Sequence, residues 1–315
     1  MSGPTTCLSC GGLASAHWTS AYDREYRTTQ QRFDYWFCRA CDCLVIDPVP
    51  IDEVEEIYPA NYYSFTDAGD QTAHRESVVR RVKAWLDDRT FRRALAATGA
   101  SSPRILDVGG GNGDVAAAIL TSAAAGATAR VVDFNAESTA IAAARGLDVT
   151  TCKFEDFETE ERFDLILMLN LVEHVADPVA TMRKAGGLLA PGGVLWVQTP
   201  NFRALDARIF RHRNWGGLHC PRHWVIYSRR GLEAALGRAG LEPIEMRTTQ
   251  GGAFWATSAL GVLRELRPLP GADARSLLEE PLFLPLAGVG AAFDLLTSPL
   301  RDASQIRLLA RARRP

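Results

Sequence analysis

Residues 105–114 have the sequence ILDVGGGNGD, the pattern of an apolar strand that runs into a glycine-rich turn. An alanine-rich helix is expected directly after the turn, over residues 114–125. Gly109, Gly111 and Gly113 alternate, and the absence of side chains there lets the backbone approach a ligand closely. The first N–H groups of the helix have no partner within the helix and are available to that ligand. The stretch therefore predicts a site for a nucleoside cofactor.

Two acidic residues bear on which cofactor this turn holds. Asp133 ends the next predicted strand, residues 129–133, at the distance from the turn where an acid binds the ribose diol of a dinucleotide. Asp107 precedes the first glycine, and its carboxylate would repel a pyrophosphate but suits a cofactor that carries an ammonium group. The turn alone leaves three interpretations open: a nicotinamide or flavin nucleotide, a cofactor with an ammonium group, or a tight turn without a ligand.

The stretch resembles motif I of the class I S-adenosylmethionine (SAM) methyltransferases, D-x-G-x-G-x-G, through Asp107 and the three alternate glycines. Later motifs of that family follow in the usual order, as FDLI at 163–166, EHVADP at 173–178 and LAPGGVL at 189–195. Residues 221–224 and 232–241 resemble a bacterial branch that acts on small molecules and often carries an N-terminal cysteine-knuckle segment. The resemblance covers residues 104–250 well and residues 1–60 more loosely, and it implies an enzyme that uses SAM.

Strands and helices alternate from residue 104 onward, which predicts an α/β fold with a mostly parallel sheet covered by helices on both faces. The resemblance implies a Rossmann-like sheet of seven strands with the last strand antiparallel, together with a small N-terminal zinc ribbon. The expected domains are a zinc-ribbon-like module at 1–50, a connector and helical cap at 51–103, and the methyltransferase domain at 104–315, with a helical insertion at about 250–304.

Five of the seven cysteines lie within the first 43 residues. Cys7 and Cys10 form one C-x-x-C knuckle and Cys38 and Cys41 form a second, and four thiolates in two such turns make a tetrahedral zinc site. Cys43 is the alternative fourth ligand, although Cys41 has the regular spacing. A module this short is expected to have little core, so metal binding would supply most of its folding free energy. We expect this N-terminal module to have a structural role or to form a lid on the substrate side of the enzyme.

The cofactor is expected at the carboxyl ends of the parallel strands, because ligands bind at that edge of open α/β sheets. The resemblance implies that Asp107 and Gly109 face the methionine part of SAM and that Asp133 binds its ribose. The turn at Phe154 would flank adenine, and Asn170 would contact the methionine amine or carboxylate. The predicted cofactor-binding residues are Asp107, Gly109, Gly111, Gly113, Asp133, Phe134, Phe154, Glu155 and Asn170.

Three histidines are the candidate catalytic residues: His174, His219 and His223. His174 follows the central strand and is the preferred general base, with a structural role in its loop as the alternative. His219 and His223 have the spacing of helical metal ligands, but Pro221 between them argues against a helix and favours a substrate loop. Glu173 and His174, together with a later histidine, partly resemble the metal site of small-RNA ribose methyltransferases. That site has a glutamate where this chain has an asparagine, so no catalytic metal is expected.

Charged residues make up 23% of the chain and its net charge is −2, so no overall field favours nucleic acid or a membrane surface. We expect a cytoplasmic protein with neither a signal peptide nor a transmembrane segment. Residues 281–293 carry no charge and have three interpretations: a buried helical pair that roofs the pocket, a dimer face, or a weak membrane-surface contact. The sequence leaves the oligomeric state open.

The favoured function is methyl transfer from SAM to a small molecule, at a hydroxyl oxygen of a natural product or sugar. A C-methyltransferase that acts on a nucleotide sugar is the nearest alternative, because such enzymes also pair cysteine knuckles with this domain. An RNA-methylating protein that docks its substrate through the ribbon is a second alternative, and the lack of a basic net charge argues against it. A non-catalytic scaffold is the third, and it is disfavoured because the acids and glycines of the turn are all present.

Overall fold

The computed structural model describes the chain apart from residues 1–2, 60–61, 63–77, 267–275, 301 and 314–315, and the side chains of 78–84. Its centre is a seven-stranded sheet. In spatial order the strands are β12 (Leu241–Thr249), β13 (Gln305–Ala312), β10 (Leu189–Pro200), β9 (Phe163–Leu169), β6 (Arg104–Val108), β7 (Thr128–Asp133) and β8 (Asp148–Thr151). The strands from β10 to β8 are parallel, and β13 is antiparallel to both neighbours. This confirms the predicted α/β fold with an antiparallel last strand.

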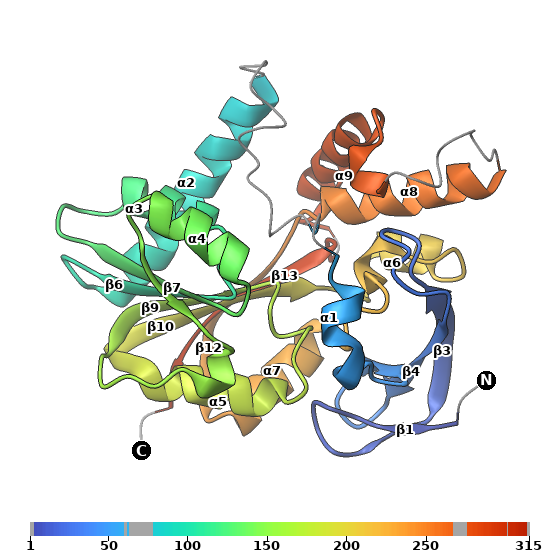
Figure 1. Ribbon diagram of the computed structural model, residues 1–315, viewed down its shortest axis with the longest axis horizontal. Helices are drawn as coiled ribbons and strands as arrows, with labels where there is room; N and C mark the ends of the chain where they lie inside the picture. Colours follow the sequence, from blue (N-terminus) through green and yellow to red (C-terminus); the bar gives the residue numbers. More distant parts are fainter. Residues whose placement is uncertain (1–2, 60–61, 63–77, 267–275, 301, 314–315) are drawn as a thin grey trace.

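Helices cover both faces of this sheet (Figure 1). One face carries α2 (Val78–Thr98), α3 (Asp114–Ser122) and α4 (Ala136–Ala144), and the other carries α5 (Pro178–Leu188) and α7 (Arg229–Arg238). Neighbouring strand residues point to opposite faces, so Ile105 packs with Phe91 of α2 while Leu106 packs in the core of Met182 and Leu232. The sheet is therefore buried on both sides, which explains why its central strands are almost wholly apolar.

A second, four-stranded sheet contains most of the N-terminal segment. Its order is β11 (Val225–Tyr227), β5 (Cys43–Asp47), β4 (Arg32–Cys38) and β3 (Ala16–Tyr22), and all its pairs are antiparallel. A two-stranded sheet of β1 (Thr5–Thr6) and β2 (Leu13–Ala14) precedes it. β11 belongs to a distant part of the chain, so the N-terminal strands are completed by the loop region that contains the predicted catalytic histidines.

The N-terminal strands have a substantial core, contrary to the expectation of a small module held by metal. Phe33 and Tyr35 of β4 and Ile46 of β5 are fully buried in one cluster with Trp215 and Ile226. Burying large apolar side chains stabilises a fold by about 1.5–3 kcal/mol each. This core could not be recognised in the N-terminal sequence, because about half of it comes from residues almost 200 positions further along the chain. This segment therefore has a source of stability that does not depend on metal.

The predicted insertion contains α8 (Gly252–Leu266) and α9 (Phe283–Thr297), which pack against each other. Asp294 of α9 is buried at their junction, where it accepts hydrogen bonds from the Gly251 N–H (3.0 Å) and the Trp255 indole (3.2 Å). The outer side of α9 is exposed, with Val289 at 70% and Leu296 at 79%, so this helix is not the buried roof that was one interpretation. Within the described residues, no helix is long and apolar enough to cross a membrane.

The remaining elements are short and lie in the connections. They are η1 (Ile51–Glu53), α1 (Val54–Ile57), η2 (Phe154–Asp156), α6 (Leu205–Phe210), η3 (Gly216–Leu218) and η5 (Leu277–Glu279). The start of α5 has the predicted form, because the Asp177 carboxylate accepts the Ala180 N–H at 2.8 Å and Pro178 occupies the first turn.

Candidate active site

The glycine turn after β6 has a backbone that residues with side chains rarely adopt. Gly109, Gly111 and Gly113 have φ of +70°, +52° and +76°. A Cβ atom at Gly113 would lie 2.4 Å from the Leu147 side chain, so the turn also lacks space for alanine. Both facts explain the alternate glycines that identify the motif in the sequence.

Asp107 lies beneath this turn with its carboxylate only partly satisfied. Its side chain is 2% exposed, and its Oδ2 has no hydrogen-bond partner among the described residues. Burial, and to a smaller extent the charge of Asp133, raises the pKa of Asp107 to about 7. A buried carboxylate oxygen without a partner is costly in free energy. Such a group fits a ligand that brings a cation or a hydrogen-bond donor to it.

Asp133 and Asn170 come from the carboxyl ends of the strands on either side of β6. The Asp133 carboxylate accepts the backbone N–H groups of Gly111 and Asn135, both at 2.9 Å, and burial raises its pKa. Asn170 has φ of +52°, and its Oδ1 is buried without a partner within the described residues. The structure therefore brings the turn, Asp107, Asp133 and Asn170 to one edge of the sheet. Phe134, which follows Asp133 in the chain, is 48% exposed.

Phe154 and Glu155 form η2, which follows β8. The Phe154 ring is 7% exposed and packs 6.2 Å from the Phe157 ring, measured between centroids. The Lys184 ammonium lies 5.4 Å from the same ring centroid and donates a hydrogen bond to the Glu155 carbonyl at 2.7 Å. The Phe154 ring therefore faces the core, and the exposed side chains of this turn are those of Lys153, Glu155 and Asp156.

The structure brings the three candidate histidines together, although they lie up to 49 positions apart in the sequence. The His174 and His223 ring centroids are 4.6 Å apart, and those of His219 and His223 are 5.0 Å apart. His219 and His223 lie in a tight loop after η3 that contains a cis Cys220–Pro221 peptide bond, which confirms that no helix joins them. Burial lowers the pKa of His174 to about 3 and that of His223 well below its usual value.

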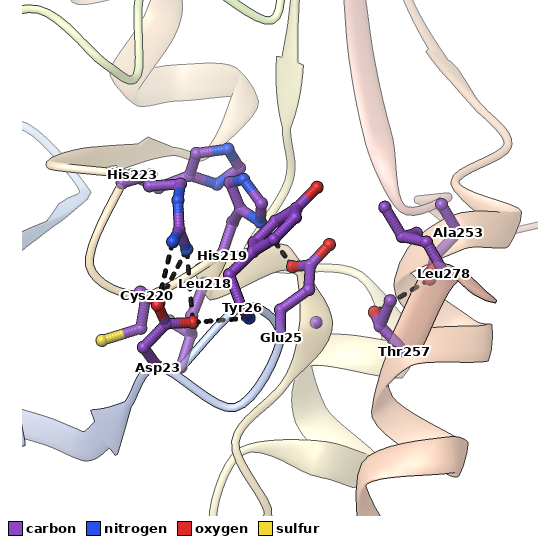
Figure 2. A network of polar contacts seen from close by, with 12 residues as sticks. Asp23, Glu25, Tyr26, Leu218, His219, Cys220, His223, Ala253, Thr257 and Leu278 are labelled. Carbon is purple, nitrogen blue, oxygen red and sulfur yellow. Dashed lines mark hydrogen bonds and ion pairs between the residues drawn. The ribbon is translucent and has the colours of Figure 1, made fainter. Parts of the chain in front are cut away.

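His219 is paired with a carboxylate from the N-terminal segment. Its Nδ1 lies 2.6 Å from Glu25 Oε2, and its Nε2 lies 3.2 Å from the Tyr62 hydroxyl. The His219 and Glu25 side chains are 8% and 12% exposed. Figure 2 shows His219 next to Glu25 and His223. A buried carboxylate that accepts the Nδ1–H of a histidine fixes the ring and stabilises its protonated form.

A fully buried ion pair anchors the histidine loop to the N-terminal segment. Arg222 donates to the Asp23 carboxylate at 2.8 Å, and neither side chain is exposed. Asp23 also accepts the backbone N–H groups of Tyr26 (3.0 Å) and Thr28 (2.9 Å), on the side of the loop that Figure 2 shows. Burial alone would raise the pKa of Asp23, but Arg222 and these donors outweigh it and lower the pKa. The pair therefore holds Glu25 close to His219.

Aromatic side chains connect the cofactor edge of the sheet with the histidines. The Tyr58 ring lies 6.3 Å from the Phe134 ring and 4.9 Å from the Tyr62 ring, between centroids. Its hydroxyl lies 2.8 Å from Nδ1 of His174. Tyr58 thus contacts both the predicted cofactor residue Phe134 and the candidate histidine His174. The sequence showed an aromatic-rich stretch here but gave no reason to place it between them.

The N-terminal cysteines form a compact group of four. Sγ of Cys7 lies 3.5 Å from Sγ of Cys41, and Sγ of Cys10 lies 3.6 Å from Sγ of Cys38. All four sulfurs lie within 4.8 Å of one another. Tetrahedral zinc with bonds of about 2.3 Å to sulfur needs sulfurs about 3.8 Å apart. Cys43 stands outside this group and points its thiol at the Cys41 carbonyl, 3.5 Å away.

Comparison with known proteins follows this geometry. A family model described as a methyltransferase domain matches residues 78–246. The ubiquinone biosynthesis O-methyltransferase of Bordetella avium is 31% identical over 159 residues, which are 46% of this chain and 64% of that protein. The enzyme of the same name from Parvibaculum lavamentivorans is 33% identical over 111 residues, 34% of this chain and 44% of that protein. The chain thus spans less than two thirds of the length of these relatives.

Among solved structures, a coclaurine N-methyltransferase bound to N-methylheliamine and SAH is 13% identical, with a TM-score of 0.49 over 84% of this chain and 81% of that one. A putative sarcosine dimethylglycine methyltransferase from Galdieria sulphuraria is 16% identical, with a TM-score of 0.49 over 74% of this chain and 87% of that one. The family model itself covers more than half of the chain, and its match agrees with the sheet order and the glycine turn. The chain belongs to the methyltransferase-domain family.

Proposed function

We propose that this protein transfers the methyl group of SAM to a hydroxyl oxygen of a small-molecule acceptor. The observation that carries the proposal is the buried Asp107 carboxylate, whose Oδ2 lacks a partner beneath the glycine turn, at one end of a site whose other end holds three histidines. The relatives named O-methyltransferases support oxygen as the acceptor atom. The net charge of −2 supports a small molecule rather than a nucleic acid.

The residues at the sheet edge fit the groups of SAM, which supplies an electrophilic methyl group when it is bound. Asp107 Oδ2 and Asn170 Oδ1 are buried acceptors without partners in the part of the chain that the structure describes, and they suit the ammonium group of the methionine part. Asp133 accepts two backbone N–H groups, and its carboxylate oxygens keep lone pairs for the ribose hydroxyls. Gly111 and Gly113 hold the turn in its positive-φ conformation, and Phe134 offers an exposed aromatic face.

At the acceptor end we assign the general-base role to His219. The Nδ1 atoms of His174 and His223 lie 3.0 Å and 2.8 Å from backbone carbonyls, so neither ring has a carboxylate at Nδ1. His219 has Glu25 at Nδ1, which orients the ring and stabilises the imidazolium that forms when Nε2 takes the proton of the acceptor hydroxyl. Tyr62 lies beside Nε2 and would position that hydroxyl. Removing a general base of this kind typically slows a reaction by about 10²–10⁴-fold.

A methyl-transfer assay tests this assignment. Purified protein is incubated with methyl-labelled SAM and a panel of phenols, catechols and sugars, and label transferred to each acceptor is measured. With an acceptor that turns over, His219→Gln is expected to lower kcat by about 10²–10⁴-fold and to leave the SAM affinity unchanged. His212→Gln is the matched control, because His212 is exposed outside the cluster. Equal rates in wild type and His219→Gln would remove His219 as the base.

We also propose that Cys7, Cys10, Cys38 and Cys41 hold a structural zinc ion. Their sulfur separations fit tetrahedral zinc, and the thiols would be deprotonated by the metal. Without a metal, hydrogen bonding to Cys41 and burial raise the pKa of the Cys7 thiol, so this thiol would stay neutral until a metal displaced its proton. The second knuckle packs against α7, where a Cβ atom on Gly231 would lie 2.7 Å from the Cys43 sulfur. Zinc would therefore fix the N-terminal sheet on the methyltransferase domain.

A further inference from the structure

Glu173 is a buried carboxylate that the site described above does not use. Its side chain is 0% exposed, and neither carboxylate oxygen has a hydrogen-bond partner among the described residues. The nearby Thr199 hydroxyl is also without a partner in hydrogen-bonding geometry. Burial raises the pKa of Glu173 to about 8, so the ionised form is costly as the side chain stands. Two unpartnered oxygens on one buried group point to a ligand that supplies positive charge.

The two histidines next to Glu173 present unprotonated nitrogens. Nδ1 of His174 lies 3.0 Å from the Arg222 carbonyl, and Nδ1 of His223 lies 2.8 Å from the Gly217 carbonyl. A carbonyl oxygen only accepts hydrogen bonds, so Nδ1 of His223 carries the proton and Nε2 keeps its lone pair. In His174 the Tyr58 hydroxyl also lies 2.8 Å from Nδ1, and a proton on Nδ1 is the arrangement that satisfies the Arg222 carbonyl, with the hydroxyl oxygen as a second acceptor. Metal-binding histidines are held in the same way, with the second ring nitrogen donating to a carbonyl or carboxylate.

These three residues face one another closely enough to share an ion. Nε2 of His223 lies 4.0 Å from Oε1 of Glu173, and one donor atom of each of the three residues lies within 4.8 Å of the others. Bonds of about 2.0–2.2 Å to a tetrahedral ion would place the donors roughly 3.4 Å apart, which small side-chain rotations supply. Two imidazoles and one carboxylate are a donor set for zinc and related divalent transition metals.

We infer that Glu173, His174 and His223 form a second metal site, for a divalent ion of the zinc class, which binds the acceptor oxygen directly. Three protein ligands leave a position open, as in catalytic zinc sites, whereas the four-cysteine site is closed. His174 is only partly buried and contacts Tyr58, so the open position is on the side of the proposed acceptor pocket. The role of this metal site in catalysis rests on the proposed function. The existence of the site rests on the three side chains alone.

The proposed step balances without any redox partner. The acceptor O–H bond would break, its proton would pass to Nε2 of His219, and the oxygen would keep the electron pair. An ion held by Glu173, His174 and His223 would supply positive charge to that oxygen. That pair then forms the O–CH₃ bond as the S–CH₃ bond of SAM breaks and S-adenosylhomocysteine leaves. A bound divalent ion lowers the pKa of an oxygen ligand by several units, which brings hydroxyl ionisation near neutral pH. The sequence led to the opposite expectation, because Asn170 stands where the resembled metal site has a glutamate. In the fold, His223 lies beside Glu173 and provides a third ligand.

Metal binding to the full-length protein tests the inference without any acceptor. The protein is purified with its cysteine site filled with zinc, and Co²⁺ is then added while metal content after dialysis and the visible spectrum are measured. Wild type is expected to bind one equivalent of Co²⁺ beyond the cysteine site, with d–d bands but no thiolate charge-transfer band. Glu173→Gln is expected to lose that equivalent, with affinity at least 100-fold weaker. Because glutamine is isosteric and uncharged, this variant is expected to fold and, without Co²⁺, to be at least as stable as wild type.

Glu25→Gln is the matched control, since it makes the same chemical change in the same cluster on a residue outside the proposed ligands, and it is expected to keep the additional Co²⁺. Wild type that binds no additional ion would overturn the inference and would mean that Glu173 is simply a protonated buried acid. An additional ion retained by Glu173→Gln would overturn the ligand assignment. SAM binding is measured on the same samples. If the protein binds SAM but no additional Co²⁺, the proposed function stands and the metal site is refuted. If it binds the additional Co²⁺ but not SAM, the metal site stands and the proposed function is refuted.

Discussion

Replacing Asp107 by asparagine is expected to stabilise the protein and to abolish tight SAM binding. The change keeps the shape of the side chain and removes its charge. Asp107 is buried with one oxygen unpartnered, and its pKa rises from 3.8 to about 7 in the folded chain. Each pKa unit corresponds to about 1.4 kcal/mol, so ionising this group in the folded protein costs about 4 kcal/mol at pH 8.

The direction in which folding stability changes with pH follows from proton binding at Asp107. Between the unfolded pKa of 3.8 and the folded pKa of about 7, the folded chain holds a proton at Asp107 that the unfolded chain has released. Stability from this group therefore falls as pH rises through that window, and it is constant above it. Burying Asp107 costs about 2 kcal/mol of folding stability at pH 5.5 and about 4 kcal/mol at pH 8. The stability gained by Asp107→Asn is therefore expected to be about 2 kcal/mol larger at pH 8 than at pH 5.5.

Urea unfolding at pH 5.5 and pH 8 without cofactor measures this difference, and calorimetric titration with SAM measures the affinity. The wild-type affinity for SAM is expected to rise from pH 6 to pH 8 as Asp107 ionises to meet the ammonium group. Loss of a charged hydrogen bond worth about 1.5–3 kcal/mol predicts SAM binding roughly 10–150-fold weaker in the variant. A variant that is no more stable at pH 8, or that binds SAM as tightly as wild type, would refute the reasoning.

Three further predictions concern other parts of the fold. Elemental analysis is expected to find zinc in wild type and in Cys43→Ser but not in Cys38→Ser, since the Cys38 sulfur belongs to the group of four and the Cys43 sulfur does not. Asp23→Ala is expected to destabilise the protein by about 3–5 kcal/mol in urea unfolding, because it leaves a fully buried guanidinium unpaired. Gly113→Ala, with φ of +76° and no space for a methyl group, is expected to cost about 2–4 kcal/mol and to prevent SAM binding in the same titration.

The methyltransferase sheet was predictable from the sequence because its signals are local. The strand at β6 and the turn that follows it are set by an apolar run and by glycines whose positive φ only glycine adopts easily. The start of α5 was equally readable, since Asp177 and Pro178 have positional preferences that need no tertiary contact. The conformational preferences of such residues are local and do not depend on distant contacts.

The acceptor end was only partly predictable because its contacts are long-range. His219 and Glu25 are 194 positions apart, and nothing near either residue indicates the other. The same holds for the N-terminal core, which β11 completes, and for the buried Glu173 carboxylate beside His223. The sequence identified the three histidines individually, but which of them shares a carboxylate and which share a possible ion depends on how the two sheets are packed.

The central claim is that the turn at residues 105–114 holds SAM, and one titration tests it most directly. Calorimetry of the full-length protein with S-adenosylhomocysteine, and separately with NAD, compares the two cofactors that the turn alone fits. We predict binding of S-adenosylhomocysteine with one site per chain, and no heat with NAD. Binding of NAD with no heat from S-adenosylhomocysteine or SAM would contradict the account, because it would mean that Asp107 does not receive the ammonium group of the methionine part.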